Sequence, residues 1–218
     1  MISRCLQVTQ VTMPEVLREA VAILRRGGVV AYPTDTVYGL AVDATNVEAI
    51  ERLYDVKGRP DAKALPLIIG DVGQLTEVAA AVPLQAEKLI AAFWPGPLTL
   101  LFEPHEALPV QLRGKSPRIG VRWPAAMLSQ QLARELGHAI TATSANCSGA
   151  PAALTAAEVA RQLGSSVDLI IDGGQAESSE VSTVLDVVSA PARIRRPGKI
   201  SSRAIEAVLG VLGPPGPM

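Results

Sequence analysis

The sequence predicts an α/β fold in which helices flank a twisted, open, mixed β-sheet. Short apolar runs bounded by turn residues alternate with stretches of helical periodicity through much of the chain, which is the pattern of a sheet covered by helices. The apolar share is 48%, yet only 3% of residues are aromatic, so Val, Ile, Leu and Ala must fill the core. A sheet buried on both faces suits that composition.

The expected strands are apolar runs at 29–32, 65–69, 98–102, 118–122, 139–142, 168–171, 183–187 and 192–195. Three helix starts show the capping-box pattern, in which a Thr caps the helix and a Glu three positions later reaches back; they lie at 12–15, 45–48 and 155–158. Helices are expected to end at Gly27, Gly137, Gly164 and Gly210. The spacing is not a regular strand–helix–strand series, which favours a mixed sheet over a parallel one.

The length of 218 residues suits one compact α/β domain. We expect this domain to span 1–210 and the Pro/Gly-rich residues 211–218 to form a flexible tail. Cys5 and Cys147 lie far apart, and with 2 His the chain lacks the ligand spacing of a zinc site. No signal pattern or apolar run of the ~20 residues that span a bilayer is present, so we expect a cytoplasmic protein that is not in a membrane.

The charge balance excludes a protein surface that binds nucleic acid non-specifically over most of its area. Formal net charge is -1, from 20 basic and 21 acidic residues, whereas such a surface needs a basic excess. Any anion-binding site must therefore come from local clusters of cations.

Two segments after expected strand or helix ends carry candidate binding groups. In the first, Thr34, Asp35, Thr36 and Tyr38 crowd a short loop after a strand, where a polar ligand could be held; the alternative is a proline turn whose side chains satisfy local backbone. In the second, residues 57–63, three cations lie on a stiff Gly/Pro loop, which suits phosphate. The alternative is a solvated helix end that complements the helix dipole.

Two further groups of residues complete the candidate set. Residues 141–149 follow a strand, and their small side chains with Ser144 and Asn146 could bind an anion through backbone N–H groups, or could be an ordinary turn. This is not a Walker A loop. Arg118, Arg122 and Arg196 lie near strand ends, with surface arginines as the alternative.

Four residues with reactive or aromatic side chains are not expected to be functional. His105 and His138 lack a partner pattern, and Cys147 lacks the His/Asn arrangement of a nucleophile. Trp94 lies in a Trp-Pro-Gly-Pro turn, where we expect a buried indole in a rigid turn.

Taken in order, these segments resemble the YrdC family, and most closely its threonylcarbamoyl-adenylate synthases. The motifs that carry the resemblance lie at 33–40, Lys57-x-Arg59, 94–99, 120–122, 144–149, 182–186 and 196–198. The resemblance implies a twisted, open α/β fold with a large, positively charged concave cleft. It also implies the joining of L-threonine, bicarbonate and ATP into threonylcarbamoyl-AMP, with release of pyrophosphate.

The same resemblance implies partners. The product would serve N6-threonylcarbamoyladenosine (t6A) formation in tRNA, through a separate transferase that moves the group onto the RNA. Mg²⁺ would accompany the triphosphate, and a local patch could touch tRNA or other double-stranded RNA. The resemblance is to the minimal, single-domain form of the family.

The resemblance also implies roles for individual residues. ATP would be bound by Lys57, Arg59, Lys63, Arg118, Ser144, Asn146 and Arg196. Threonine would be held by Thr36, Arg122 and Ser182, with Arg122 facing its carboxylate. Lys57 and Arg59 would be the catalytic cations, and their replacement by Ala is expected to lower turnover without unfolding the protein.

One departure and two alternatives qualify this assignment. Many relatives have a threonine-contacting His where this chain has Gly70, which changes that side of the amino-acid pocket. One alternative is a carbamoyl-adenylate-forming domain, although zinc-finger and acylphosphatase-like segments are missing here. The other is a non-catalytic RNA-binding module, which the balanced charge and few aromatics disfavour.

Overall fold

The computed structural model describes residues 4–58, 64–176 and 181–214. The helices are α1 (Met13–Arg25), α2 (Val47–Lys57), α3 (Leu75–Val78), α4 (Leu84–Phe93), α5 (Met127–Leu136), α6 (Ala156–Leu163) and α7 (Ser202–Leu209). The strands are β1 (Arg4–Gln7), β2 (Val30–Tyr32), β3 (Gly39–Ala41), β4 (Leu67–Ile68), β5 (Leu98–Phe102), β6 (Ile119–Arg122), β7 (Ile140–Thr141), β8 (Thr143–Ser144), β9 (Leu169–Asp172), β10 (Thr183–Asp186) and β11 (Arg193–Arg196). The mixed α/β class expected from the sequence is confirmed.

The strands are divided between two sheets rather than gathered in one. One sheet has the order β1-β9-β2-β3-β8, and the other has the order β11-β10-β5-β6-β4-β7. Both are mixed: β2 runs parallel to β9 and antiparallel to β3, and β5 runs parallel to β10 and antiparallel to β6. Only Ala142 separates β7 in one sheet from β8 in the other, so this short segment joins the two sheets.

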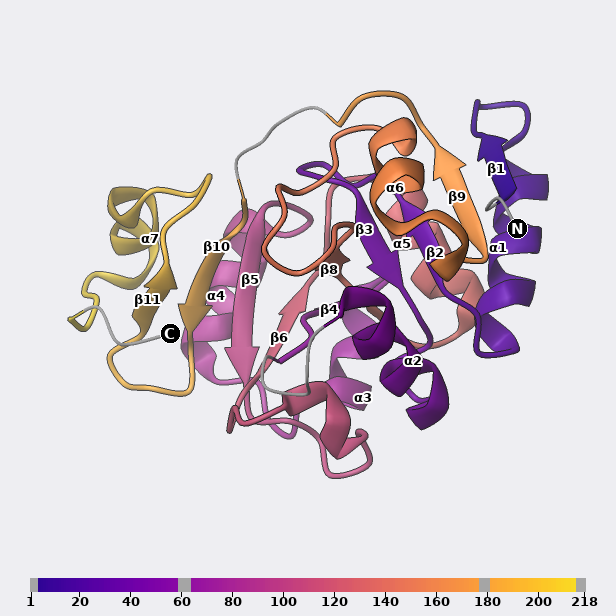
Figure 1. The fold of residues 1–218 in the computed structure, drawn as a ribbon. Helices are drawn as coiled ribbons and strands as arrows, with labels where there is room; N and C mark the ends of the chain where they lie inside the picture. Colours follow the sequence, from indigo (N-terminus) through magenta and orange to yellow (C-terminus); the bar gives the residue numbers. More distant parts are fainter. Residues whose placement is uncertain (1–3, 59–63, 177–180, 215–218) are drawn as a thin grey trace.

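Helices cover both sheets and bury an aliphatic core. Helix α1 packs against α5 beside β2 and β9, and its buried face includes Leu17, Ala20 and Leu24. At the other end of the molecule α4 packs against α7. Figure 1 shows these two ends, with β1 and α1 on one side and β11 and α7 on the other. The core is built mainly from Val, Ile, Leu and Ala, as the composition predicts.

Helix boundaries agree with the sequence at most ends but not at every cap. Gly137, Gly164 and Gly210 follow α5, α6 and α7 directly. Thr155 caps α6 by accepting a hydrogen bond from the Glu158 N–H at 3.2 Å. The other two capping boxes are wrong: Thr12 makes no cap hydrogen bond, and Asn46 rather than Thr45 caps α2. Thr45 instead donates to Asp43, a competing local bond typical of short polar side chains.

Candidate functional site

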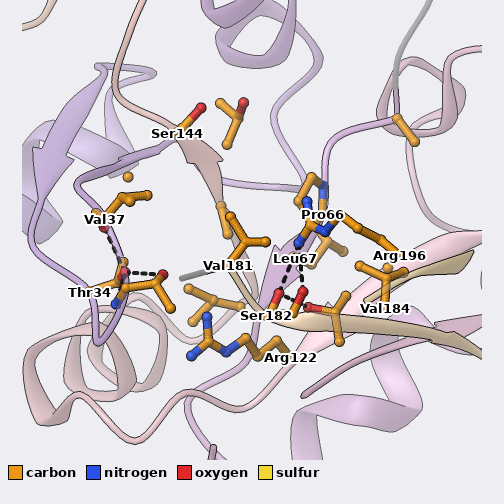
Figure 2. A pocket seen from close by; sticks show the side chains of 18 of the residues that line it. Thr34, Val37, Pro66, Leu67, Arg122, Ser144, Val181, Ser182, Val184 and Arg196 are labelled. Atoms are coloured by element: carbon orange, nitrogen blue, oxygen red, sulfur yellow. Dashed lines mark hydrogen bonds between the residues drawn. The ribbon is translucent and has the colours of Figure 1, made fainter. Parts of the chain in front are cut away.

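A cavity of about 410 Å³ opens where the two sheets meet. Its wall includes β3 and β8 from one sheet, and β4, β5, β6, β10 and β11 from the other. We call it the central cavity. Figure 2 shows Thr34 and Val37 on one side, Ser144 on another, and Arg122, Ser182 and Arg196 along the strands of the second sheet. Segments far apart in the sequence therefore share one site.

The polar part of this wall consists of hydroxyl and guanidinium groups. Its polar residues are Thr34, Thr36, Tyr38, Thr99, Ser116, Arg118, Arg122, Thr143, Ser144, Ser182 and Arg196. Among the described residues that line the cavity, the charged ones are these three arginines, and none is acidic. The wall therefore presents hydrogen-bond donors to an anion. Because Arg118 and Arg122 each have a carboxylate within 4 Å, a net positive potential of the cleft remains a prediction.

Arg122 ends β6 and is the most deeply placed of these cations, with its side chain 9% exposed. Its Nε donates to the Gly96 carbonyl at 2.9 Å, and its Nη2 forms an ion pair with Asp35. Burial lowers the pKa of Arg122, and the neighbouring Asp35 carboxylate acts against that shift. The ordinary pKa of arginine is so high that the guanidinium stays charged near neutral pH.

The loop after β2 presents one hydroxyl as an acceptor. Thr34 Oγ1 donates to the Val37 carbonyl at 2.6 Å, so its single proton is used. The 3.0 Å contact between Thr34 Oγ1 and Thr36 Oγ1 then has Thr36 as the donor. Thr36, which lines the cavity, is left with lone pairs for a ligand N–H or O–H. The alternative of a turn whose side chains bond to local backbone groups therefore holds for Thr34, whereas Thr36 remains available to a ligand.

The phenol of Tyr38 holds this loop to another segment through two hydrogen bonds. Burial raises its pKa to about 12, so the phenol stays protonated at neutral pH. It donates to the Gly174 carbonyl at 2.7 Å and accepts from the Gly173 N–H at 3.2 Å. The phenol thus ties the loop to the segment after β9, and its hydroxyl has a structural role.

Ser182, Arg196 and Thr99 form a hydrogen-bonded group on the second sheet. Arg196 Nη2 donates to the Ser182 carbonyl at 2.9 Å and to its Oγ at 3.1 Å. Ser182 Oγ lies 2.9 Å from Thr99 Oγ1. Burial lowers the pKa of Arg196, and the neighbouring Arg122 lowers it further. Thr99 was not assigned a role from the sequence, because a Thr inside an apolar strand gives no signal of its own.

Lys57 and Asn146 organise the loop beneath Ser144. Lys57 is 3% exposed, and its Nζ donates to Ser144 O at 2.5 Å, Asn146 O at 2.7 Å and Asn146 Oδ1 at 3.0 Å. Asn146 Nδ2 donates to Cys147 O and Ala150 O. The three hydrogens of the ammonium are thus matched by three oxygens. A direct grip on phosphate by either side chain would require these bonds to be exchanged.

The structure gathers most of the residues expected at the site. Three residues of the expected ATP set line the central cavity: Arg118, Ser144 and Arg196. All three residues of the expected threonine set line it as well: Thr36, Arg122 and Ser182. Lys57 and Asn146 lie behind the wall and are not among its lining residues. Arg59 and Lys63 fall outside the described residues. The expectation that replacing Lys57 would leave the fold intact does not fit its burial.

Gly70 lies off the cavity wall, packed against α5. Its N–H donates to Gln74 Oε1 at 2.6 Å, and its carbonyl accepts from Arg134 Nη2 at 3.0 Å. A Cβ added there would lie 2.6 Å from the Arg134 nitrogen and 2.7 Å from the Gln130 carbonyl oxygen, both backbone atoms. This position therefore admits no side chain without a shift of α5, and a histidine does not fit it.

The residues set aside from the sequence lie outside the cavity wall. Trp94 is 7% exposed and its indole donates to Leu98 O at 2.7 Å, which confirms the buried indole. His138 is exposed, and Cys147 Sγ contacts the Gln162 carbonyl.

Across the described ranges, no group of three His, Cys, Asp or Glu side chains could hold a metal ion. No helix within the described ranges is long and apolar enough to cross a bilayer.

The family model Sua5/YciO/YrdC, described as "Telomere recombination", matches residues 22–198. The chain belongs to this family. A threonylcarbamoyl-AMP synthase from Pyrococcus abyssi is 38% identical over 194 residues, which cover 89% of this chain and 57% of that one. A threonylcarbamoyl-AMP synthase from Nitrosococcus oceani is 41% identical and covers 72% of this chain and 85% of that one.

Solved structures of this family have the same fold. P. abyssi Sua5 complexed with L-threonine matches with a TM-score of 0.91 at 34% identity, over 98% of this chain and 62% of that one. Escherichia coli YciO matches with a TM-score of 0.82 at 27% identity, over 94% of this chain and all of that one. The chain spans 57% and 56% of the length of the curated relatives from P. abyssi and Bacillus subtilis.

Proposed function

We propose that this chain is an L-threonylcarbamoyladenylate synthase, a nucleotidyltransferase that joins L-threonine, bicarbonate and ATP. The observation that carries the proposal is the likeness to P. abyssi Sua5, a structure complexed with L-threonine, over 98% of this chain. The central cavity supports it, because its wall offers hydroxyls and three guanidinium groups to ligands that are all anionic or zwitterionic.

Threonine is assigned to the part of the cavity that contains Arg122, Thr36 and Ser182. A guanidinium binds a carboxylate through two parallel hydrogen bonds, so Arg122 is the natural partner of the amino-acid carboxylate. Thr36 Oγ1 has free lone pairs, which suit the amine or the hydroxyl of threonine. Ser182 lies between this part and Arg196 and could contact either ligand.

ATP is assigned to the part that contains Ser144, Arg196 and Arg118. Arg196 donates to no carboxylate among the described residues, so its remaining N–H groups suit a phosphate. Lys57 Nζ donates to the Ser144 carbonyl and the Ser144 hydroxyl donates to Asn146 Oδ1, so both residues support this part from behind the wall. The expected contacts of Arg59 and Lys63 with the triphosphate remain part of the proposal.

The chemistry needs placement and charge stabilisation rather than a covalent nucleophile. Bicarbonate first releases hydroxide to give carbon dioxide, and the threonine amine adds to its carbon. The amine proton combines with that hydroxide to form water, which leaves a carbamate. A carbamate oxygen then forms a bond to the α-phosphorus of ATP, the bond to the bridging oxygen breaks, and pyrophosphate leaves. Fixed guanidinium donors near the reacting groups favour both steps by holding anions together.

Mg²⁺ fits poorly as an ion held by this chain. It prefers carboxylate, phosphate and water oxygens, and the described residues of the cavity wall include no carboxylate. We therefore propose that Mg²⁺ enters bound to the triphosphate.

The proposed product is an activated carbamoyl group that must be passed to RNA. We propose a tRNA threonylcarbamoyl-transferase as its consumer, acting in the cytoplasm in the synthesis of t6A. Weak binding of tRNA or double-stranded RNA by this chain is part of the same proposal. Residues 1–210 are proposed to form the catalytic domain, with 211–218 as its tail.

Pyrophosphate release by the purified protein tests the proposed function. The expected result is release from ATP that needs both L-threonine and bicarbonate. Pyrophosphate release that does not require L-threonine but requires carbamoyl phosphate would instead indicate a carbamoyl-adenylate enzyme. Tight binding of structured RNA with no turnover would contradict the enzyme and indicate an RNA-binding module.

A further inference from the structure

The side chain of Arg122 is held along one edge. Arginine has five N–H donors in a fixed planar fork, and Nε and Nη2 point one hydrogen each along the same edge. Here Nε binds the Gly96 carbonyl at 2.9 Å and Nη2 binds Asp35. Among the described residues none accepts a hydrogen bond from Nη1, although Arg122 lines the cavity. The edge that carries Nη1 is therefore left for a ligand.

Asp35 stands behind Arg122 and not on the cavity wall. Its side chain is 14% exposed, and it is not one of the lining residues. Its second oxygen, Oδ1, is buried and has no hydrogen-bond partner among the described residues. A ligand in the cavity thus meets Arg122 first, and Asp35 can act on that ligand only through Arg122.

A buried guanidinium in this place needs a restraint. Arg196 lies close enough on the same wall for its charge to act against that of Arg122, and like charges in a partly buried site repel each other strongly. Within the described ranges, Asp35 is the carboxylate that forms an ion pair with Arg122. A long side chain without such a partner would gain rotamer freedom and turn away from its neighbouring cation.

We propose that Asp35 is a positioning residue, which holds one edge of the Arg122 guanidinium so that the other edge receives the carboxylate of L-threonine. The assignment rests on the proposed function, since it concerns the same amino-acid site. Asp35 also lowers the positive charge that the ligand carboxylate meets. Positioning and charge therefore act in opposite directions, and an experiment can separate them.

Isothermal titration calorimetry separates the two effects with two ligands, L-threonine and L-threoninamide, which lacks the carboxylate. Asp35→Asn keeps the shape of the side chain and removes its charge. We expect this variant to bind L-threonine about tenfold more weakly, a loss typical of one strong hydrogen bond. L-threoninamide and ATP should bind within twofold of their affinities for the unchanged protein, because neither brings a carboxylate to the Arg122 fork.

The matched control is Asp168→Asn. Asp168 also pairs with an arginine, Arg52, at 2.8 Å, but neither residue lines the cavity. This variant should bind all three ligands like the unchanged protein. If Asp35→Asn fails to fold, as judged by circular dichroism, Asp35→Glu serves instead, because its extra methylene displaces the carboxylate and should weaken L-threonine selectively as well.

Three results would overturn the proposal. Tighter binding of L-threonine to Asp35→Asn would show that Asp35 balances charge and does not position Arg122. An equal loss for L-threonine and L-threoninamide would show a general structural role. A failure of the unchanged protein to bind L-threonine would remove the proposed substrate itself, and is distinguished from the other two because it appears before any variant is made.

Discussion

Two buried cations, Lys57 and Arg122, hold the two parts of the central cavity in different ways. Lys57 binds backbone and amide oxygens of Ser144 and Asn146, 87 and 89 residues further along the chain. Arg122 binds a carboxylate and one carbonyl, yet remains on the cavity wall. Lys57 donates its hydrogen bonds to oxygens of the protein, whereas Arg122 keeps N–H groups for a ligand.

Residue type and location therefore do not by themselves determine the role of a buried cation. Both residues belong to motifs that suggest anion binding, and both are mostly removed from water. What separates them is the number of N–H groups already matched by protein oxygens. Changes at Lys57 should therefore act mainly on stability, and changes at Arg122 mainly on ligand affinity.

The largest expected effect is on folding, from Lys57→Met. Methionine fills similar space but cannot donate to the three oxygens that Lys57 binds. Ser144 O and Asn146 Oδ1 keep a second donor, the Asn146 N–H and the Ser144 hydroxyl, whereas Asn146 O loses its Lys57 donor. Because one buried carbonyl is left unsatisfied and two charge-assisted hydrogen bonds are lost, we expect the free energy of unfolding to fall by about 3 kcal/mol. Urea denaturation followed by circular dichroism measures it.

Lys88→Met is the control for this change. Lys88 is exposed on α4, so its replacement should alter stability by less than about 0.5 kcal/mol. A Lys57→Met protein as stable as the control, yet unable to bind ATP, would restore the expected direct role of Lys57 at phosphate.

A smaller effect is expected from Asp186→Asn. Asp186 is 1% exposed and accepts hydrogen bonds from Arg195 at 2.5 Å and from the Val188 and Ser189 N–H groups at 3.1 and 3.2 Å. Burial acts to raise the pKa of this carboxyl, but these donors outweigh burial and hold the pKa below its usual range. At pH 7 the variant should lose about 2 kcal/mol of stability.

The pH dependence follows from the sign of that shift. A carboxyl whose pKa is lower in the folded state stabilises the fold above its unfolded-state pKa, about 3.9, and this contribution is lost as pH falls through the folded-state value. Urea midpoints from pH 7 down to pH 3 should fall less steeply for Asp186→Asn than for the unchanged protein. Parallel curves for the two proteins would contradict this role of Asp186.

The sequence predicts the class of fold and the main strands because their signals are local. The run at 98–102 matches β5, and the apolar stretch at 183–187 contains β10. Strands β3 and β8 were missed because they lie inside motifs interpreted as loops, and β8 has only two residues. The division into two sheets depends on the switch at Ala142, which no local pattern marks.

The site was predictable as a set of residues but not as an arrangement. The family resemblance implied that Thr36, Arg122 and Ser182 share one site, and all three line the central cavity. The pairing of Arg122 with Asp35 joins residues 87 positions apart, and only tertiary structure determines it. Asp35 carried a usable signal all the same, because a carboxylate between two threonines in a loop that follows a buried strand needs a partner.

Kinetics of Arg122→Lys test whether the Arg122 guanidinium binds the carboxylate of L-threonine. Lysine keeps the positive charge, but its single nitrogen cannot contact Gly96, Asp35 and a ligand carboxylate with the geometry of a planar fork. In the pyrophosphate assay we predict a KM for L-threonine raised at least about tenfold, with the KM for ATP changed less than twofold. Unchanged KM for L-threonine, or equal increases for both substrates, would contradict the assignment of Arg122 to the amino acid.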